Sequence, residues 1–353
     1  MDTRSILAPV QSRSPVQRLR PRDRAVVATR LSERPVIAAG SISGYGPIFN
    51  AGVIIHDGRY HLFARAVRDG YRPNPRTGPG EPRFLDYVSD LLSFTSRDGL
   101  DYRFQKVLHR SEPGAIFEDP RVQTVTSGGE PHFLLSYTNV PARETGKTWR
   151  AAICELHYGE GEFTIGPDPI IGPDGVPNKD VVLCNLEGGR IALIQRLEQN
   201  IWPQQSIQLA IFDTLDDIWA TTPEFWQHYM DTLADQIIIA PRPGSNGVGA
   251  GAPPLLVEGE LVFFYHERDG KNIYTTRVAL LDERSGRVKA LLPEPILGPE
   301  LAWELHGDVD NVIFVQGAQL CSNGTIYLTY GAADRHVGAA SLDANAVLAA
   351  LHG

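Results

Sequence analysis

The feature that most constrains the fold of this chain is a hairpin pattern that occurs five times. Each copy has an apolar run, a tight polar turn with glycine or acidic residues, and a second apolar run that ends in tyrosine or a charged residue. Successive copies begin roughly 60 to 70 residues apart, which is the signature of a repeat architecture. The copies are GVIIHDGRYHLFARA from Gly52, RVQTVTSGGEPHFLLSYTN from Arg121, VVLCNLEGGRIALIQRL from Val181, PPLLVEGELVFFYHE from Pro253 and VIFVQGAQLCSNGTIYLTYGA from Val312.

Each copy predicts two paired strands. His61, Phe63 and Arg65 alternate with Leu62 and Ala64, which is the period-two pattern of a strand. Asp-Gly or Gly-Gly between two such runs indicates a hairpin. Each copy precedes a segment expected to form another strand pair, as in FTSRDGLDYRF, LHYGEGEFTI, AIFDTLDDIW and ALLDERSGRVKAL. About four strands repeated five times predict an all-β, five-bladed β-propeller. A β-sandwich with long insertions is the alternative, and it explains the regular spacing less well.

The ends of the chain depart from the repeat. Residues 1–35 are expected to form an N-terminal arm or extension, because the chain is arginine-rich and proline-punctuated through about residue 24. This arm is a candidate flexible extension, oligomer contact or surface helix. Residues 36–353 are expected to form the propeller domain, in which SLDANAVLAALHG predicts a short C-terminal helix and TTPEFWQHYMDTLADQ a loop or short helix.

Composition excludes several classes of function. The formal net charge of −9 argues against a nucleic-acid partner, and neither a zinc-type cysteine cluster nor an RNA-binding motif occurs. Cys154, Cys184 and Cys321 are odd in number and far apart, which favours reduced thiols in the cytoplasm over disulfides. No apolar run approaches the roughly 18 residues of a membrane helix, and no secretory signal begins the chain. We therefore expect a soluble cytoplasmic protein without a metal cofactor.

The candidate site residues follow from the predicted architecture. In a propeller the first strand of each blade reaches the axis, so polar residues at equivalent positions of the five blades converge there. Such residues precede or begin the inner strands at Asn50, Asp119, Arg121, Lys179, Asp180 and Asp308, and they end the inner hairpins at Arg65, Tyr137, Arg196, His266 and Tyr330. Carboxylates and cations are thus expected to meet in one pocket.

The motifs FNAG, EDPRV, KDVVL, GAGAPP with YH downstream, GDVDNVIF and YGAAD together resemble those of glycoside hydrolase family 130. The resemblance spans roughly residues 40 to 345 and involves every predicted blade in order. That family contains β-mannoside phosphorylases and related β-mannosidases on five-bladed propellers. The resemblance implies inverting cleavage of a β-mannoside by inorganic phosphate, which gives α-mannose 1-phosphate and a shortened sugar.

The resemblance also implies the catalytic residue. Asp119 matches the general acid of the family, which passes its proton through a mannose hydroxyl. Such a role requires a raised pKa, which burial and the adjacent Glu118 favour and which neighbouring cations oppose. Read without the other motifs, the same pair is a turn at the start of a strand, with Asp119 capping backbone amides.

The remaining candidate residues divide between phosphate and sugar. Arginine suits bidentate contacts to a phosphate dianion, and lysine acts as a point charge. Lys179 and Arg196 match phosphate-site positions of the family, and Arg65 and His266 are expected to join them. The expected substrate-binding residues are Asn50, Arg121, Asp180, Asp308 and Tyr330, while Asp334 is expected to stabilise the closure of the last blade.

Two alternatives stay open at this point. Gln195-Arg196-Leu197 replaces the His-Arg-Pro that many family members carry, which removes one expected phosphate donor. An inverting hydrolase needs a carboxylate base for water, and Glu187 and Glu198 are candidates for it. A non-catalytic glycan-binding propeller is the alternative from another class.

Overall fold

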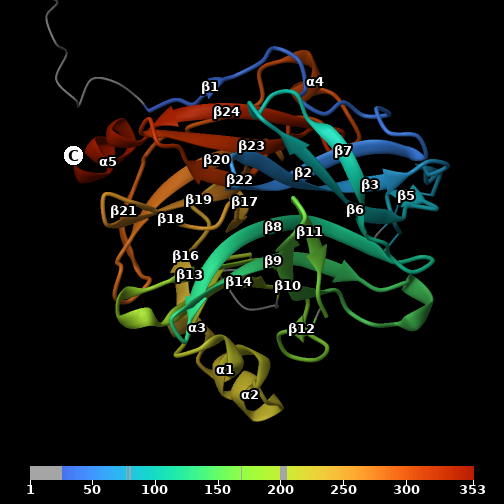
Figure 1. The fold of residues 1–353 in the computed structure, drawn as a ribbon. Helices are drawn as coiled ribbons and strands as arrows, with labels where there is room; N and C mark the ends of the chain where they lie inside the picture. The colour runs from blue at the N-terminus through green and yellow to red at the C-terminus, as the bar shows by residue number, and fades with distance from the viewer. Residues whose placement is uncertain (1–25, 77, 79–80, 168, 199–204) are drawn as a thin grey trace, which may run out of the picture.

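The computed structural model describes residues 26–76, 78, 81–167, 169–198 and 205–353, and most of these residues lie in β-strands with a few short helices (Figure 1). The first 25 residues of the predicted arm lie outside the described residues. Within the described ranges, no helix is long and apolar enough to cross a membrane. The strands form five groups that follow one another along the sequence.

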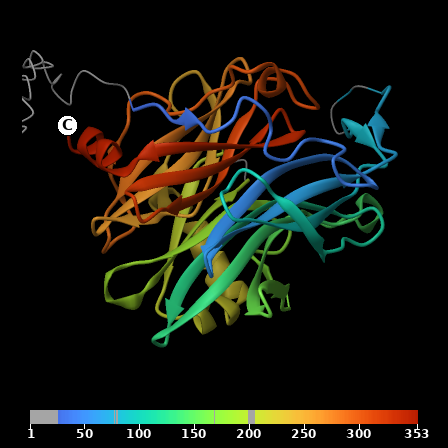
Figure 2. The ribbon, with the colours of Figure 1, turned by 45° about the horizontal axis from the view of Figure 1, so that its top comes forward.

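The first two groups share one nine-stranded sheet, in which a single parallel bridge between Ser89 and Ile116 joins them. The first group contains β2 (Tyr45–His56), β3 (Arg59–Arg68), β6 (Ser89–Ser96) and β7 (Arg103–His109). The second group contains β8 (Ile116–Ser127), β9 (Glu130–Val140), β10 (Arg150–Gly159), β11 (Glu162–Ile165) and β12 (Ile170–Ile171). A separate small hairpin, β4 (Arg72–Pro73) with β5 (Phe84–Leu85), projects from the first group and is seen in cyan at the upper right of Figure 2.

The other three groups form separate sheets of antiparallel strands. The third contains β13 (Asn178–Asn185), β14 (Ile191–Leu197), β15 (Ile207–Phe212) and β16 (Ile237–Ile239). The fourth contains β17 (Ser245–Ala250), β18 (Leu255–Val257), β19 (Glu260–Asp269), β20 (Tyr274–Leu281) and β21 (Val288–Leu291). The fifth contains β22 (Ile313–Leu320), β23 (Thr325–Ala332) and β24 (His336–Asp343), and β1 (Thr29–Arg30) from the other end of the chain pairs with the edge of β24.

The structure confirms the five predicted hairpins, which are the pairs β2–β3, β8–β9, β13–β14, β18–β19 and β22–β23. The prediction of a strand pair in AIFDTLDDIW is wrong in its second half, because a helix begins after β15. Thr214 and Asp217 form a reciprocal capping box at the start of this helix, and Leu215 and Ile218 are buried one helical turn apart. These local signals for a helix outweigh the expected hairpin.

The described residues also contain five short α-helices, which are α1 (Leu215–Trp219), α2 (Pro223–Asp231), α3 (Leu233–Gln236), α4 (Ala302–Leu305) and α5 (Ala344–His352), and two 3-10 turns at Arg143–Thr145 and Glu187–Gly189. The predicted C-terminal helix is α5, and the segment around Trp226 is α2 followed by α3. Helices α1 and α2 project together at the lower edge of Figure 1, far from α5.

Apolar side chains fill the spaces between neighbouring groups of strands. One cluster joins the fourth and fifth groups through residues such as Phe264 and Leu328, and another joins the second and third through Val125 and Leu183. All four side chains are essentially inaccessible to solvent. Burying a side chain of this size contributes roughly 1.5–3 kcal/mol, so the packing of one group on the next holds the inner strands in place.

Candidate active site

Three inner strands share an unusual backbone feature at the positions where the sequence predicts functional side chains. Asn50, Asp119 and Asp180 have positive φ angles of 48°, 57° and 56°. Each lies at a β-bulge, where the register of its strand shifts against the partner. Asn and Asp tolerate the left-handed conformation better than most residues, and a bulge redirects side chains next to functional sites. The same local device therefore aims equivalent residues of three groups toward one region.

Asp119 lies in the first part of this region, and only 8% of its surface is exposed. Its Oδ1 atom accepts a hydrogen bond of 2.7 Å from Asn50 Nδ2. Arg65 Nη1 lies 3.5 Å from the same oxygen, and Arg65 Nη2 lies 3.1 Å from Glu118 Oε1. Glu118 thus has a defined partner in the structure, which the sequence did not indicate. One buried arginine holds both carboxylates of the motif EDPRV.

Arg65 is held by aromatic rings as well as by carboxylates. Its guanidinium carbon lies 4.9 Å from the centre of the Phe49 ring and 5.5 Å from that of Tyr87, within the range of a cation–π contact. Burial alone would lower the pKa of Arg65, but Tyr87, Glu118 and Asp119 outweigh burial and raise it above the usual arginine value. Arg65 therefore stays charged, and Tyr87 is a member of the site that the sequence analysis missed.

Asp334 is a second residue whose connection to the site was missed. Its surface is partly exposed, yet surrounding protein removes enough water to raise the pKa of its carboxyl to about 7. Arg65 opposes this rise, while the charges of Asp119, Glu118 and Asp308 add to it. Asp334 thus belongs electrostatically to the Asp119 region, which the sequence could not reveal because its neighbours come from three distant segments.

Arg121 connects Asp119 to the second part of the site, and it is almost fully buried. Nη1 donates to the Asp119 carbonyl oxygen at 2.9 Å, and Nη2 donates to Asp180 Oδ1 at 2.9 Å. Nε donates to the Gly251 carbonyl at 2.8 Å, and Nη2 also donates to the Ala250 carbonyl at 2.8 Å. Arg121 therefore ties β8 to β13 and to the segment after β17 from inside the protein.

Asp180 is the anionic centre of the second part and is also nearly inaccessible. Besides its contact with Arg121, Asp180 forms an ion pair with Arg196, in which Nη2 lies 3.1 Å from Asp180 Oδ2. His266 Nε2 lies 3.7 Å from the same oxygen. Burial would raise the pKa of Asp180, but Arg196 and Arg121 overcome it and hold the pKa well below the usual range. Asp180 is therefore ionised and compensated by two arginines.

Three of the four basic side chains expected to hold phosphate, Lys179, Arg196 and His266, lie around Asp180, whereas Arg65 lies beside Asp119 and Glu118. Lys179 and Arg196 are direct cross-strand partners on β13 and β14. Both approach Glu198 Oε1, at 3.8 Å from Lys179 Nζ and 3.3 Å from Arg196 Nη2. His266 Nε2 lies 3.5 Å from Arg196 Nη1. These four residues come from the third and fourth groups, so the predicted neighbours are brought together, with Glu198 among them.

His266 is neutral in this environment. Burial is the largest cause that lowers its pKa well below the ordinary value, and Arg196 and Arg121 lower it further against the effect of Asp180. The ring packs at 4.1 Å from that of Phe314. Gly249 makes this arrangement feasible, because a Cβ there would lie 2.3 Å from Asp180 Oδ2 and 2.4 Å from His266 Cε1. Gly249 of GVGAGAPP thus leaves room for the side chains of Asp180 and His266.

Two predicted residues lie differently from the rest. Asp308 accepts a hydrogen bond of 2.6 Å from the Tyr71 hydroxyl and one of 3.0 Å from Arg335 Nη1, and it borders the region through its effect on Asp334. Tyr330 is not brought to the site. Its ring is completely buried in the core between the fourth and fifth groups, and its hydroxyl donates to Glu304 Oε1 at 2.9 Å.

Comparisons with known proteins identify the family of this chain. A family model described as glycoside hydrolase family 130, β-1,4-mannooligosaccharide phosphorylase, matches residues 224–352. The β-1,2-mannobiose phosphorylase of Thermoanaerobacter sp. strain X514 is 30% identical over 324 residues, which cover 89% of this chain and 97% of that protein. The chain belongs to glycoside hydrolase family 130.

A second relative and one solved structure extend the comparison. The 1,2-β-oligomannan phosphorylase of the same Thermoanaerobacter strain is 28% identical, and the match covers 89% of this chain and 96% of that protein. The solved structure of the β-1,2-mannobiose phosphorylase from Listeria innocua superposes with a TM-score of 0.72 at 18% identity, and covers 92% of this chain and 99% of that chain. At that identity the likeness concerns the fold.

The family 130 model matches a smaller part of the candidate site than the two relatives do. The segment 224–352 contains His266, Asp308 and Asp334 but not Asp119 or Arg196. The matches to the family 130 relatives extend over most of the chain. Within the described residues, no group of three or more His, Cys, Asp or Glu side chains is placed to hold a metal ion.

Proposed function

We propose that this protein is an inverting β-mannoside phosphorylase, which cleaves a β-mannoside with inorganic phosphate to give α-mannose 1-phosphate and a shortened sugar. The observation that carries the proposal is a compact basic cluster of Lys179, Arg196 and His266 that Asp180 and Arg121 link to the backbone carbonyl of Asp119. The two full-length relatives are named as phosphorylases of β-1,2-linked mannosides, which supports both the reaction and the sugar.

In the proposed reaction, Asp119 is the proton source and phosphate is the nucleophile. Asn50 and Arg65 hold the Asp119 carboxyl in place, and the family resemblance implies that its proton reaches the leaving oxygen through a mannose hydroxyl. Arg196 and Lys179 provide the positive charge for the phosphate dianion, with Arg196 suited to paired hydrogen bonds. Attack from the face opposite to the leaving sugar inverts the configuration at the anomeric carbon.

For the remaining predicted residues we propose supporting roles. Asn50 and Asp308 are candidates for contacts with sugar hydroxyls, because both lie at the edge of the Asp119 region. Arg121 and Asp180 are proposed to orient the site rather than to bind substrate, since each is about 1% exposed. Tyr330 is not included, because its hydroxyl is engaged with Glu304 in the core.

We further propose that the five groups of strands are the blades of a five-bladed propeller formed by residues 36–353. The order of contacts supports a ring: β2 contacts β8, β8 contacts β13, β13 contacts β17, β20 contacts β22, and β22 contacts β2. Pairing of β1 with β24 adds an N-terminal strand to the last blade, which fits the proposed arm of residues 1–35. A cytoplasmic location and self-association remain part of this proposal.

A β-mannosidase is the second candidate function, and Glu198 is the observation that favours it. This carboxylate lies within the basic cluster, where it is placed to activate water in a hydrolytic reaction. Glu187, the other candidate base, pairs instead with the exposed Arg284 at the far end of β13. A purely glycan-binding role would not require an acid such as Asp119 next to the basic cluster, so it explains the site less well.

The decisive experiment is incubation of the enzyme with β-1,2- and β-1,4-linked mannobiose and with mannosyl-glucose, each with and without phosphate. Release of mannose 1-phosphate that requires phosphate supports the proposal and identifies the linkage. Release of free mannose at the same rate without phosphate refutes phosphorolysis and favours the mannosidase. Binding without turnover of any of these sugars favours the non-catalytic alternative.

A further inference from the structure

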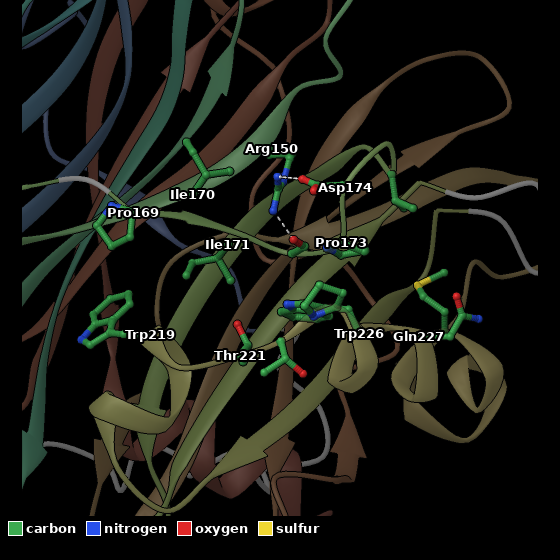
Figure 3. Close-up of a pocket in the computed structure, with 15 residues that line it drawn as sticks. Arg150, Pro169, Ile170, Ile171, Pro173, Asp174, Trp219, Thr221, Trp226 and Gln227 are labelled. Carbon is green, nitrogen blue, oxygen red and sulfur yellow. Dashed lines mark hydrogen bonds and ion pairs between the residues drawn. The ribbon is translucent and has the colours of Figure 1, made fainter.

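A cavity of about 470 Å³ lies outside the candidate active site, between the second group of strands and the helices that project from the third (Figure 3). Ile170, Pro173 and Asp174 line one side of it. Trp219, Trp226 and Gln227 from α1 and α2 line the opposite side. Helix α1 stands where the second strand of AIFDTLDDIW was expected, and together with α2 it forms a helical wall that faces β12.

A second cavity of about 510 Å³ adjoins the first, and Arg150, Ile170 and Asp174 border both. Lys147 and Thr148 from the segment before β10 line its outer part. Each cavity alone lies within the range of about 300–1,000 Å³ that is common for small-molecule sites. We call these two adjoining cavities together the depression, and two cavities side by side suit a chain of several units better than a single compact ligand.

The lining combines open apolar surface with hydrogen-bonding groups. Trp219 and Ile170 are 37% and 38% exposed, which is unusual for side chains of this size. Arg150 donates to the Asp174 carboxylate and to the Gly172 carbonyl oxygen, while Asp174 keeps most of its carboxylate surface in solvent. A pyranose has an apolar C–H face and a rim of hydroxyls, so it matches a partly exposed indole beside an exposed carboxylate.

The depression is linked to the basic cluster through the start of β13. The loop after β12 leads directly to Asn178, whose backbone N–H donates to the Trp149 carbonyl oxygen at 3.2 Å. The Asn178 side chain donates to the Ile171 carbonyl at 3.4 Å. Lys179, the next residue, belongs to the basic cluster. The wall of the depression and one side of the candidate active site are therefore built on the same strand end.

We propose that this depression binds mannosyl units of a β-mannoside chain that are remote from the bond being cleaved, with Trp219 as the stacking platform. This proposal rests on the proposed function, since it takes its ligand class from the β-mannoside substrate. The Asp174 carboxylate accepts hydrogen bonds from hydroxyls of these units, and the Gln227 side-chain amide donates to them. The site gives the enzyme a preference for longer oligosaccharides over the disaccharide.

The test compares phosphorolysis of mannobiose with that of the mannohexaose of the same linkage in the wild type and in Trp219→Ala. We expect Trp219→Ala to raise KM for the hexaose by about three- to tenfold, the range of one aromatic contact, and to leave kcat and the disaccharide KM unchanged. Trp219→Phe is expected to retain most of the preference. Leu256→Ala is the matched control, because Leu256 is 62% exposed on β18 and lines neither cavity.

Gln227→Ala, on the exposed face of α2, tests the same site without altering Trp219, and we expect a smaller rise of the hexaose KM. Equal shifts for disaccharide and hexaose, or no shift in both variants, overturn the proposal. A change of oligomeric state in Trp219→Ala also overturns it, because a second copy of the chain would then cover the depression.

Titration calorimetry of mannohexaose in the absence of phosphate separates this proposal from the proposed function. If the wild type releases no mannose 1-phosphate from any β-mannoside, the proposed function fails, but weaker hexaose binding by Trp219→Ala still supports the site. If turnover is as proposed and both proteins bind hexaose equally, the site fails alone.

Discussion

Replacing Arg121 by methionine is expected to destabilise the protein strongly, although the change removes no surface charge. Arg121 uses four hydrogen bonds to join Asp180 with three backbone carbonyls, all away from solvent. Removing one member of a buried ion pair costs about 3–5 kcal/mol, because the remaining charge and carbonyls are left without partners. Arg196 still compensates Asp180 in the variant, so we expect the lower half of this range.

Urea unfolding followed by fluorescence measures this effect as a lower midpoint at an unchanged slope. Arg121→Lys is expected to fall between wild type and Arg121→Met, since lysine keeps the charge but cannot reproduce the planar set of donors. Arg284→Met is the matched control, because its ion pair with Glu187 is exposed and such pairs contribute little. We expect no measurable change in this control.

The combination of Arg121→Met with Asp180→Asn isolates the pair from the surrounding packing. The double variant is expected to lose less stability than the sum of the losses in the two single variants. The reason is that it removes both charges of the Arg121–Asp180 pair, so that neither charge is left buried without this partner. A loss below about 1 kcal/mol for Arg121→Met would refute the reasoning, since it would mean that the buried network is readily replaced by apolar packing. Additive losses would show that the two side chains act independently.

Three further predictions concern residues of the candidate active site. Asp119→Asn is expected to abolish mannose 1-phosphate release while calorimetry still detects the disaccharide, and normal turnover would remove the acid assignment. Arg196→Met is expected to raise KM for phosphate roughly ten- to hundredfold, because a hydrogen bond to a charged group contributes about 1.5–3 kcal/mol; an unchanged phosphate KM would contradict its role. The pKa of Asp334 is raised from 3.8 to about 7, so its stabilising contribution is complete below about pH 4 and is lost as pH rises through 7. The free energy of unfolding in urea should therefore differ less between pH 5 and pH 8 in Asp334→Asn than in the wild type. An identical difference in the two proteins would exclude this titration of Asp334.

The five hairpins were predictable because their signals are local. Alternating apolar residues and Gly-containing turns are complete within each copy of the repeat. The helix α1 was missed for a related reason: the capping residues Thr214 and Asp217 carry the information, but the repeat pattern led us to expect a strand there. At this segment the helix-capping residues and the repeat pattern predict different structures, and the structure follows the capping residues.

The direction of side chains was harder to predict than the strands themselves. Tyr330 follows the same pattern as His266 and Arg196 at the end of an inner hairpin, yet it lies in the core. A bulge between Val315 and Gly317 lies opposite Tyr330, just as the bulge at Asn50 lies opposite Arg65, so the bulge does not distinguish the two positions. The Tyr330 hydroxyl instead bonds Glu304 of α4, and the Trp303 ring of the same helix stacks on the Tyr330 ring. Sequence spacing within the repeat does not reveal a partner that comes from a separate helix.

The two kinds of arginine in the site differ in how free they are to meet a new anion. Arg121 is saturated by Asp180 and carbonyls and has almost no exposed surface, so phosphate can reach it only by breaking the core. Arg196 is slightly exposed, and its contacts with Glu198 and His266 are longer, at 3.3 Å and 3.5 Å. Glu198 contacts both cations that the proposed reaction assigns to phosphate. If phosphate binds there as proposed, we expect it to replace Glu198 as the partner of Arg196 and Lys179, so that these cations are compensated with and without the co-substrate.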